Sequence, residues 1–305
     1  GSLGRFFDSV EPDDKMGMEN WEEAESAMQE KAAGLALKKG KLTEQEMDYS
    51  FAGDLLGQLI ATSFGSGSLH VPLFGLYGAC STMGEALGLG AMTVNAGYGK
   101  NVLAMASSHF ATAEKEFRFP LGYANQRPLS AHWTVTGSGA FIVGKNRSHV
   151  RITGVTVGKI VDYGLKDSQN MGACMAPAAC DTIIQNLEDF ERKETDYDRI
   201  ITGDLGYVGQ SILFDLMRGK EHDIKINHMD CGMTIFDQNL QDTHAGGSGC
   251  GCAAATLSAY ILPKISRGEW KRVLFVPTGA LMSTVSYNEG ASVPGIAHGI
   301  VLEHC

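Results

Sequence analysis

The sequence predicts an α/β protein made of two copies of one half-domain, because three pairs of similar segments recur in the same order. In the first pair an apolar run ends at Gly-Asp-Leu, and in the second a helix rich in small residues closes at a glycine five residues before an apolar strand. In the third pair a glycine-containing turn leads into a buried strand. Three pairs at compatible spacing indicate an internal repeat. The pairs are 48–55 with 198–205, 78–106 with 249–276, and 136–143 with 296–302.

Each half is expected to form a mixed five-stranded sheet covered by helices, since its elements alternate between strand and helix. The two central helices should begin at Cys80 and near Gly251, and their Gly and Ala content lets them pack closely between the two sheets. The halves are expected to cover residues 1–148 and 149–305. The alternating run 150–157 predicts a strand with no counterpart ahead of Leu3, so one N-terminal strand of the first half is expected to be missing from the sequence.

Composition excludes several classes of protein. A net charge of −10 and a pI near 5.4 argue against a nucleic-acid-binding surface, which needs a clustered positive field. No apolar run approaches the roughly 18 to 20 residues that span a bilayer, and we predict neither a signal peptide nor a transmembrane segment. The seven cysteines lack a zinc-ligand spacing, so a reducing compartment is expected, with no metal site and no cofactor.

A cysteine at the turn into a buried helix, within a duplicated half-domain, is similar to the thiolase superfamily and to its ketoacyl-acyl-carrier-protein synthase III branch. Longer segments resemble the stage V sporulation protein AD family over essentially the whole chain. The resemblance implies a thiolase-like fold, in which two pseudo-symmetric halves form a five-layer αβαβα sandwich. The segments are AGDLLGQ (52–58), GACST (78–82), SSHFATAEKEFRFP (107–120), TVTGSGA (134–140), DSQNMGACMAPAACDTI (167–183), AGGSGCGCA (245–253) and PGIAHGIVLE (294–303).

The resemblance also implies a function. It implies non-catalytic binding of dipicolinic acid (pyridine-2,6-dicarboxylate), with or without calcium, for uptake of this compound into the developing spore during sporulation. The expected location is peripheral to the inner spore membrane, where other spore membrane transport proteins would be partners. A homodimer is the expected oligomeric state.

The condensing-enzyme site is expected to be degenerate. Cys80 stands at the position of the nucleophile, but Gly203-Asp204 and Gly251 stand where the related enzymes carry their His and Asn. A carboxylate would oppose rather than stabilise a developing enolate. The alternative is an active acyltransferase or condensing enzyme that uses Cys80 as nucleophile with His109 or the later His298 as base.

Other interpretations of these side chains stay open at this point. Each histidine is also compatible with a neutral ring that donates to a backbone carbonyl, an interpretation that suits His298 better than His109. Cys80 is also compatible with a small buried side chain left over from an enzyme ancestor. In a third interpretation the protein is a scaffold whose pocket is vestigial.

A planar dianion needs hydrogen-bond donors at both ends, and two segments are expected to supply them. They are the helix start at Cys80 and the 246–249 turn. Arg118 is the preferred carboxylate clamp, and a structural ion pair with Glu114 or Glu116 is its alternative. The predicted ligand-binding residues are Cys80, His109, Arg118, Gly203, Asp204, Ser248, Gly251 and Gly279.

Two further predictions concern polar side chains close to these positions. Ser81 and Thr82 are expected to cap the first helical turn through their hydroxyl groups. Asp54 and Asp204 end matching strands, and we expect them to fix turns rather than to bind metal.

Overall fold

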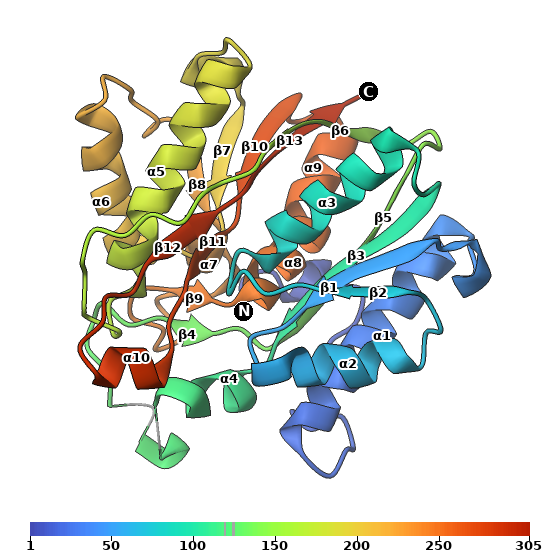
Figure 1. Cartoon of the computed structure of the whole chain (residues 1–305), viewed down its shortest axis with the longest axis horizontal. Helices are drawn as coiled ribbons and strands as arrows, with labels where there is room; N and C mark the ends of the chain where they lie inside the picture. Colours follow the sequence, from blue (N-terminus) through green and yellow to red (C-terminus); the bar gives the residue numbers. More distant parts are fainter. Residues whose placement is uncertain (119, 124–125) are drawn as a thin grey trace.

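The computed structural model describes residues 1–118, 120–123 and 126–305, and it contains two sheets that lie on either side of a pair of central helices (Figure 1). The first sheet has the order β2-β1-β3-β5 and the second the order β8-β7-β10-β13-β6. In the first sheet β1 pairs in parallel with β2 and β3, and β3 pairs antiparallel with β5. In the second sheet β7 pairs in parallel with β8 and β10, and β13 pairs antiparallel with both β10 and β6. The first-sheet strands are β1 (Tyr49–Gly53), β2 (Leu73–Gly75), β3 (Asn101–Ser108) and β5 (Gly137–Gly144); those of the second are β6 (Val150–Thr156), β7 (Arg199–Thr202), β8 (His228–Asp230), β10 (Arg272–Val276) and β13 (Gly299–His304).

The duplication predicted from the sequence extends to side-chain contacts. Asp48, ahead of β1, accepts the backbone N–H groups of Lys100 (2.6 Å) and Asn101 (3.2 Å). Asp198, ahead of β7, accepts those of Lys271 (2.5 Å) and of the residue after it (2.9 Å). In each half an equivalent aspartate therefore connects the starts of two neighbouring parallel strands, β1 and β3 in the first half and β7 and β10 in the second.

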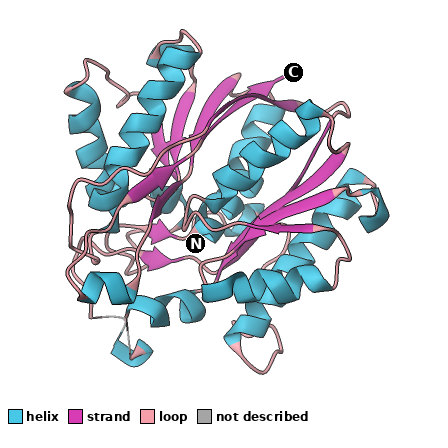
Figure 2. Ribbon diagram, in the orientation of Figure 1, coloured by secondary structure: helices cyan, strands magenta, loops and turns pink. Residues whose placement is uncertain are grey.

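Helices on the outer faces complete the layers (Figure 2). α1 begins after Asn20, whose side chain accepts the Glu23 N–H, and α5 begins after Asn170, whose side chain accepts the Ala173 N–H. Both are Asn N-caps, which satisfy backbone donors that a helix start leaves free. The outer helices are α1 (Trp21–Gly40) and α2 (Ile60–Gly67) against the first sheet, and α5 (Met171–Asp189) and α6 (Gly206–Arg218) against the second.

The central layer is α3 (Thr82–Ala96) and α8 (Cys250–Thr256), the latter continued by a π-helical turn and α9 (Leu262–Ser266). Small residues allow this layer to fit. A methyl group on Gly84 would lie 3.2 Å from the His298 carbonyl oxygen, and one on Gly90 would lie 3.1 Å from Val102. α3 therefore reaches both sheets at van der Waals distance, as its Gly and Ala content predicted.

The hydrophobic core follows the layers. One cluster joins both sheets to the central helices, with Met83 and Phe275 completely buried. A second cluster lies between α5, α6 and the second sheet, and a third between α1 and the first sheet. Together with the outer helices, this gives the order helix, sheet, helix, sheet, helix.

Short strands form two small additional sheets, of which β4–β9 joins the two halves and β11–β12 lies within the second half. β4 (Trp133–Thr134) pairs with β9 (Gly247–Ser248), and β11 (Thr278–Ala280) pairs with β12 (Gly295–Ala297). Other short helices are α4 (Phe110–Phe117), α7 (Cys231–Ile235) and α10 (Thr284–Asn288). None of the helices in the described residues is long and apolar enough to cross a bilayer. Within the described residues the first sheet has four strands and the second has five.

Candidate functional site

Cys80 lies in a tight turn that leads from β2 into α3. The Ser81 hydroxyl donates to the Gly78 carbonyl oxygen (2.7 Å), and the Thr82 hydroxyl donates to that of Ala79 (2.7 Å) and accepts the Gly78 N–H (3.1 Å). The prediction that both hydroxyls cap the first helical turn is therefore wrong. Ala79 explains the difference, because its positive φ of 49° folds the chain back so that the hydroxyls close the turn itself.

Gly279 of β11 supports this turn from the other half of the molecule. A methyl group at Gly279 would lie 2.3 Å from the Gly78 carbonyl oxygen and 3.3 Å from the Cys80 nitrogen. Only a residue without a side chain fits there unless the backbone moves. The predicted residue Gly279 thus lies against the backbone of Cys80.

Asp204 follows β7 and contacts Cys80 across the interface of the halves. One carboxylate oxygen accepts the Thr278 hydroxyl (2.7 Å), the other accepts the Gly249 N–H (3.0 Å), and the Cys80 thiol donates to the same carboxylate. Asp204 is only 1% exposed. The prediction that it fixes a local turn is wrong, because its partners come from β11, the start of α8 and the turn before α3.

This arrangement sets the protonation of both side chains. Burial, followed by the negative charge and hydrogen bond of Asp204, raises the pKa of the Cys80 thiol well above its ordinary value. Burial also raises the pKa of Asp204 to about 7, partly offset by its three hydrogen bonds. The thiolate, which is the nucleophilic form of cysteine, is therefore disfavoured at neutral pH.

Asp230, at the end of β8, performs the turn-fixing role in this half. Its carboxylate accepts the N–H groups of Leu205 (2.9 Å), Gly206 (3.2 Å) and Met233 (3.1 Å), and also the Thr202 hydroxyl (2.6 Å). These bonds hold the chain on both sides of Asp204. Asp204 therefore remains available to face Cys80.

The other predicted glycines and Ser248 form the walls around this centre. A methyl group on Gly203 would lie 3.0 Å from Pro277 and Thr278. Gly251, near the start of α8, donates its N–H to the Ser108 hydroxyl (3.1 Å), and a methyl group there would lie 2.3 Å from the Gly137 carbonyl oxygen. Ser248 is buried in β9, and its carbonyl oxygen accepts the Val135 N–H (2.8 Å).

The two candidate histidines are held by backbone groups. His109 is the N-cap of α4: its Nδ1 accepts the Ala111 N–H (3.1 Å), and its Nε2 donates to the Asp14 carbonyl oxygen (2.8 Å). His298 accepts the Gly158 N–H on Nδ1 (3.2 Å), and burial lowers its pKa, which favours the neutral ring. No hydrogen bond or ion pair within the described residues joins either ring to Cys80 or Asp204.

Arg118 makes the ion pair that the sequence analysis gave as its alternative. The guanidinium is paired with the fully buried carboxylate of Glu114 and also donates to the Gln169 side chain (3.1 Å). Glu114 in turn accepts the N–H (3.0 Å) and hydroxyl (2.9 Å) of Thr134 in β4. This network joins α4 to the segment before α5.

Sequence reasoning missed Thr278 and Asp230, which complete the surroundings of Asp204. Both stand at or just after the end of a strand in the second half, where side chains of neighbouring strands meet. The signal was therefore present, but no repeat partner in the first half pointed to either residue.

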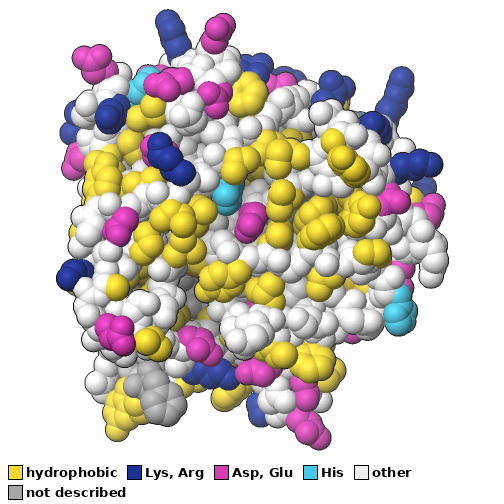
Figure 3. All heavy atoms as spheres, viewed as in Figure 1, with side chains coloured by type: hydrophobic (Ala, Val, Ile, Leu, Met, Phe, Trp, Pro, Cys, Tyr) yellow, Lys and Arg dark blue, Asp and Glu magenta, His cyan; other side chains and the backbone are white. Residues whose placement is uncertain are grey.

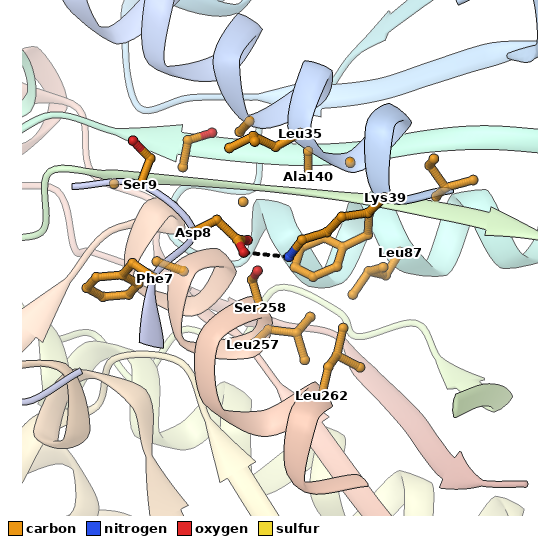
Figure 4. Close-up of a pocket in the computed structure, with 18 of the residues that line it drawn as sticks. Phe7, Asp8, Ser9, Leu35, Lys39, Leu87, Ala140, Leu257, Ser258 and Leu262 are labelled. Atoms are coloured by element: carbon orange, nitrogen blue, oxygen red, sulfur yellow. Dashed lines mark hydrogen bonds and ion pairs between the residues drawn. The ribbon is translucent and has the colours of Figure 1, made fainter. Parts of the chain in front are cut away.

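A large groove lies elsewhere, along β5 (Figure 4). It has a volume of about 1650 Å³ and is lined by residues such as Leu35, Leu87 and Ala140, with an ion pair between Asp8 and Lys39 (2.6 Å) across it. Its lining includes His109 but neither Cys80 nor Asp204. Within the described ranges, no group of three or more His, Cys, Asp or Glu side chains is arranged to hold a metal ion.

Comparison with known proteins identifies the family. Residues 1–303 match the family described as stage V sporulation protein AD. The chain belongs to this family. It is 40% identical over 303 residues to stage V sporulation protein AD of Bacillus subtilis (strain 168), an alignment that covers 99% of this chain and 89% of that protein. Its role is therefore in sporulation.

Solved structures show the same fold at low sequence identity. The tetronic acid condensing enzyme AbyA1 matches with a TM-score of 0.62 and 15% identity, covering 91% of this chain and 86% of its own. The Acat5 thiolase from Ascaris suum, in complex with coenzyme A, matches with a TM-score of 0.60 and 10% identity. This match covers 92% of this chain and 94% of the thiolase chain. The 3-oxoacyl-[acyl-carrier-protein] synthase III from Aquifex aeolicus VF5 matches with a TM-score of 0.57 and 15% identity. This match covers 92% of this chain and 84% of the synthase chain. The predicted thiolase-like fold is confirmed.

Proposed function

We propose that the protein binds dipicolinic acid without catalysing acyl transfer, and that this binding serves uptake of the compound into the developing spore. The observation that carries the proposal is the contact between Asp204 and the Cys80 thiol. A condensing enzyme needs a group that activates its cysteine and stabilises a developing enolate. Here a buried carboxylate stands beside the thiol and favours its protonated form.

The same surroundings suit a small planar ligand. The backbone turns at Gly78–Thr82 and Gly246–Gly249 meet at Asp204, and backbone turns of this kind supply N–H donors to anions. Thr278 adds a hydroxyl group. The Gly249 N–H and the Thr278 hydroxyl already donate to the Asp204 carboxylate, and in this proposal the same kinds of group recognise a ligand carboxylate without covalent chemistry.

Calorimetric titration tests the proposal. Dipicolinate should bind saturably, whereas isophthalate, which lacks the ring nitrogen, should bind more weakly; both titrations are repeated with calcium. Cys80→Leu should abolish binding because it replaces the thiol beside Asp204 with a larger apolar side chain. Cys305→Leu, the same change at the exposed C-terminal cysteine, is the matched control and should bind like the unmodified protein. Absence of saturable binding by the folded protein would contradict the proposal.

The second candidate is an acyltransferase that uses Cys80 as nucleophile. It is favoured by the position of Cys80 at the turn into α3, within a fold shared with condensing enzymes. Incubation with a labelled acyl-CoA and mass spectrometry of the peptide that contains Cys80 tests it. An acyl group on Cys80 that is lost in Cys80→Ala would establish this chemistry.

A homodimer formed through β2 is part of the proposal. In the described part of the chain β2 pairs only with β1, and its Leu73 and Phe74 are exposed, as is Tyr77. Apolar side chains gather over the middle of the face that carries α3 and β2 (Figure 3). Residues 55–84 contain no Asp, Glu, Lys or Arg, so two chains of charge −10 can meet there without close like-charge contacts.

Two identical edge strands pair antiparallel about a two-fold axis, which gives an isologous interface. Phe74→Glu should convert a dimer to a monomer in light scattering. Tyr98→Glu, at another exposed aromatic side chain, is the control, because Tyr98 lies beyond the end of α3. A monomeric unmodified protein would refute this part.

The remaining part of the proposal concerns location. We place the protein on the surface of the inner spore membrane with membrane-embedded transport proteins as partners. Fractionation of sporulating cells should recover it with the membrane, and high salt or loss of those partners should release it.

A further inference from the structure

Among the residues that the structure describes, the surroundings of Asp204 contain hydrogen-bond donors but no cation. Its three donors, the Thr278 hydroxyl, the Gly249 N–H and the Cys80 thiol, are all neutral. The ionisable side chains that interact with it electrostatically come from the turn before α3, from β8, α7 and α8: Cys80, Asp230, Cys231, Cys250 and Cys252. No ion pair among the described residues includes Asp204.

This composition has a consequence for an anionic ligand. A carboxylate that enters beside an ionised, buried Asp204 is repelled strongly, because water does not screen the two charges there. A protonated Asp204 removes this repulsion. It also gains an O–H donor that a ligand oxygen accepts.

We propose that Asp204 takes up one proton from solvent when the site binds its carboxylate ligand, so that ligand binding is coupled to pH. The proposal rests on the proposed function and adds the regulation of that site. No covalent bond changes: the proton comes from the buffer and stays on the Asp204 carboxyl group while the ligand is bound.

The hydrogen bonds explain why Asp204 rather than Asp230 takes the proton. Asp230 accepts three backbone N–H groups and one hydroxyl, which stabilise its ionised form. In the described part of the chain, the side chain of Asp204 accepts one backbone N–H, that of Gly249. Its pKa of about 7 also places the exchange within the physiological range.

The experiment is titration calorimetry with dipicolinate in buffers that differ in ionisation enthalpy, at pH 6 and pH 8. Near pH 8 the free protein holds Asp204 largely ionised, so close to one proton should be taken up per ligand; at pH 6 uptake should be close to zero. Affinity should fall about tenfold per pH unit above pH 7 and be flat below pH 6. Proton uptake in the unmodified protein does not depend on the stability of any variant.

Two variants localise the proton. Asp204→Asn, which cannot ionise, should bind dipicolinate with no proton uptake and the same affinity at pH 6 and pH 8. Glu25→Gln is the control, because Glu25 is a second buried carboxyl group whose pKa is raised to about 7 by burial and by Asp54, yet it hydrogen-bonds to Ser107 and Thr112 instead. This control should keep the full pH dependence.

The outcomes separate the inference from the proposed function. Saturable binding without proton uptake, or unchanged uptake in Asp204→Asn, overturns the inference and leaves the function standing. Binding by Asp204→Asn alone shows that Asp204 stays ionised and repels the ligand, which also overturns the inference. Absence of binding by both proteins at either pH overturns the proposed function and the inference together.

Discussion

Both halves have an aspartate just after a matching strand, Asp54 after β1 and Asp204 after β7, but the two carboxylates accept hydrogen bonds from different parts of the molecule. Asp54 accepts the Leu56 N–H (2.7 Å) and both the N–H (2.7 Å) and hydroxyl (2.6 Å) of Thr62, all within its own half. Asp204 instead contacts Cys80, Gly249 and Thr278. The first half uses its aspartate to close a turn, and the second half gives that task to Asp230. Duplication therefore supplied the position, and the site lies where the symmetry is broken.

The largest difference between the halves is expected at the glycines that end the matching strands. A methyl group on Gly53 would lie 2.1 Å from the Leu76 carbonyl oxygen, whereas the nearest atoms to one on Gly203 are 3.0 Å away. Gly53→Ala should lower the free energy of unfolding by about 3 kcal/mol or more, and Gly203→Ala by about 1 to 2 kcal/mol. Urea unfolding of both variants measures this, and equal losses would contradict the comparison.

The second difference concerns pH. Because the pKa of Asp204 is raised to about 7 by burial, the folded state holds a proton that the unfolded chain has released above pH 4. Stability from this group is therefore present at low pH, declines up to about pH 7 and then levels off. Asp204→Asn should remove a decline of about 2 to 3 kcal/mol between pH 5 and pH 7.5, at about 1.4 kcal/mol per unit.

Glu25, whose pKa is also raised to about 7, adds a similar decline in the free energy of unfolding with rising pH. Glu25→Gln should remove only this second decline and leave the contribution of Asp204 unchanged. Unfolding by urea at a series of pH values measures both variants. A pH profile that is the same in Asp204→Asn and the unmodified protein would refute the assignment.

Amide substitutions sharpen the comparison at the two aspartates. Both carboxylate oxygens of Asp54 accept backbone N–H groups, so in Asp54→Asn the new side-chain NH₂ group faces one of these N–H donors. This substitution should lower the free energy of unfolding by about 2 kcal/mol. Asp204→Asn retains its contacts, because the Thr278 hydroxyl can rotate to accept the new N–H. At pH 7.5 it should be at least as stable as the unmodified protein in the same urea titration.

The smallest expected effect is at His109. Because this side chain caps α4, His109→Ala should cost about 1 kcal/mol, and His109→Asn, which keeps a cap acceptor, should restore most of it. Dipicolinate affinity should be unchanged in both variants, as measured by calorimetry. A large loss of affinity in the well-folded His109→Asn protein would show that the ring contacts the ligand.

The sequence by itself determined the architecture. Patterns at Gly-Asp-Leu and at the two helices rich in small residues are local, so they revealed the repeat, the matching strand ends and the buried central helices. The distinctive segments identified the family. The position of Cys80 at a turn into a buried helix also followed from neighbouring residues alone.

Only the tertiary structure decided which side chains meet. Asp204 lies beside Cys80 because β7, β11 and the start of α8 converge on the turn before α3, and a repeat pattern carries no information about contacts between halves. For the same reason Arg118 pairs with Glu114 and Gln169, and His109 holds the Asp14 loop. Local sequence patterns determine the secondary structure, whereas the packing of segments far apart in the sequence determines the protonation and the hydrogen bonds of the side chains in the site.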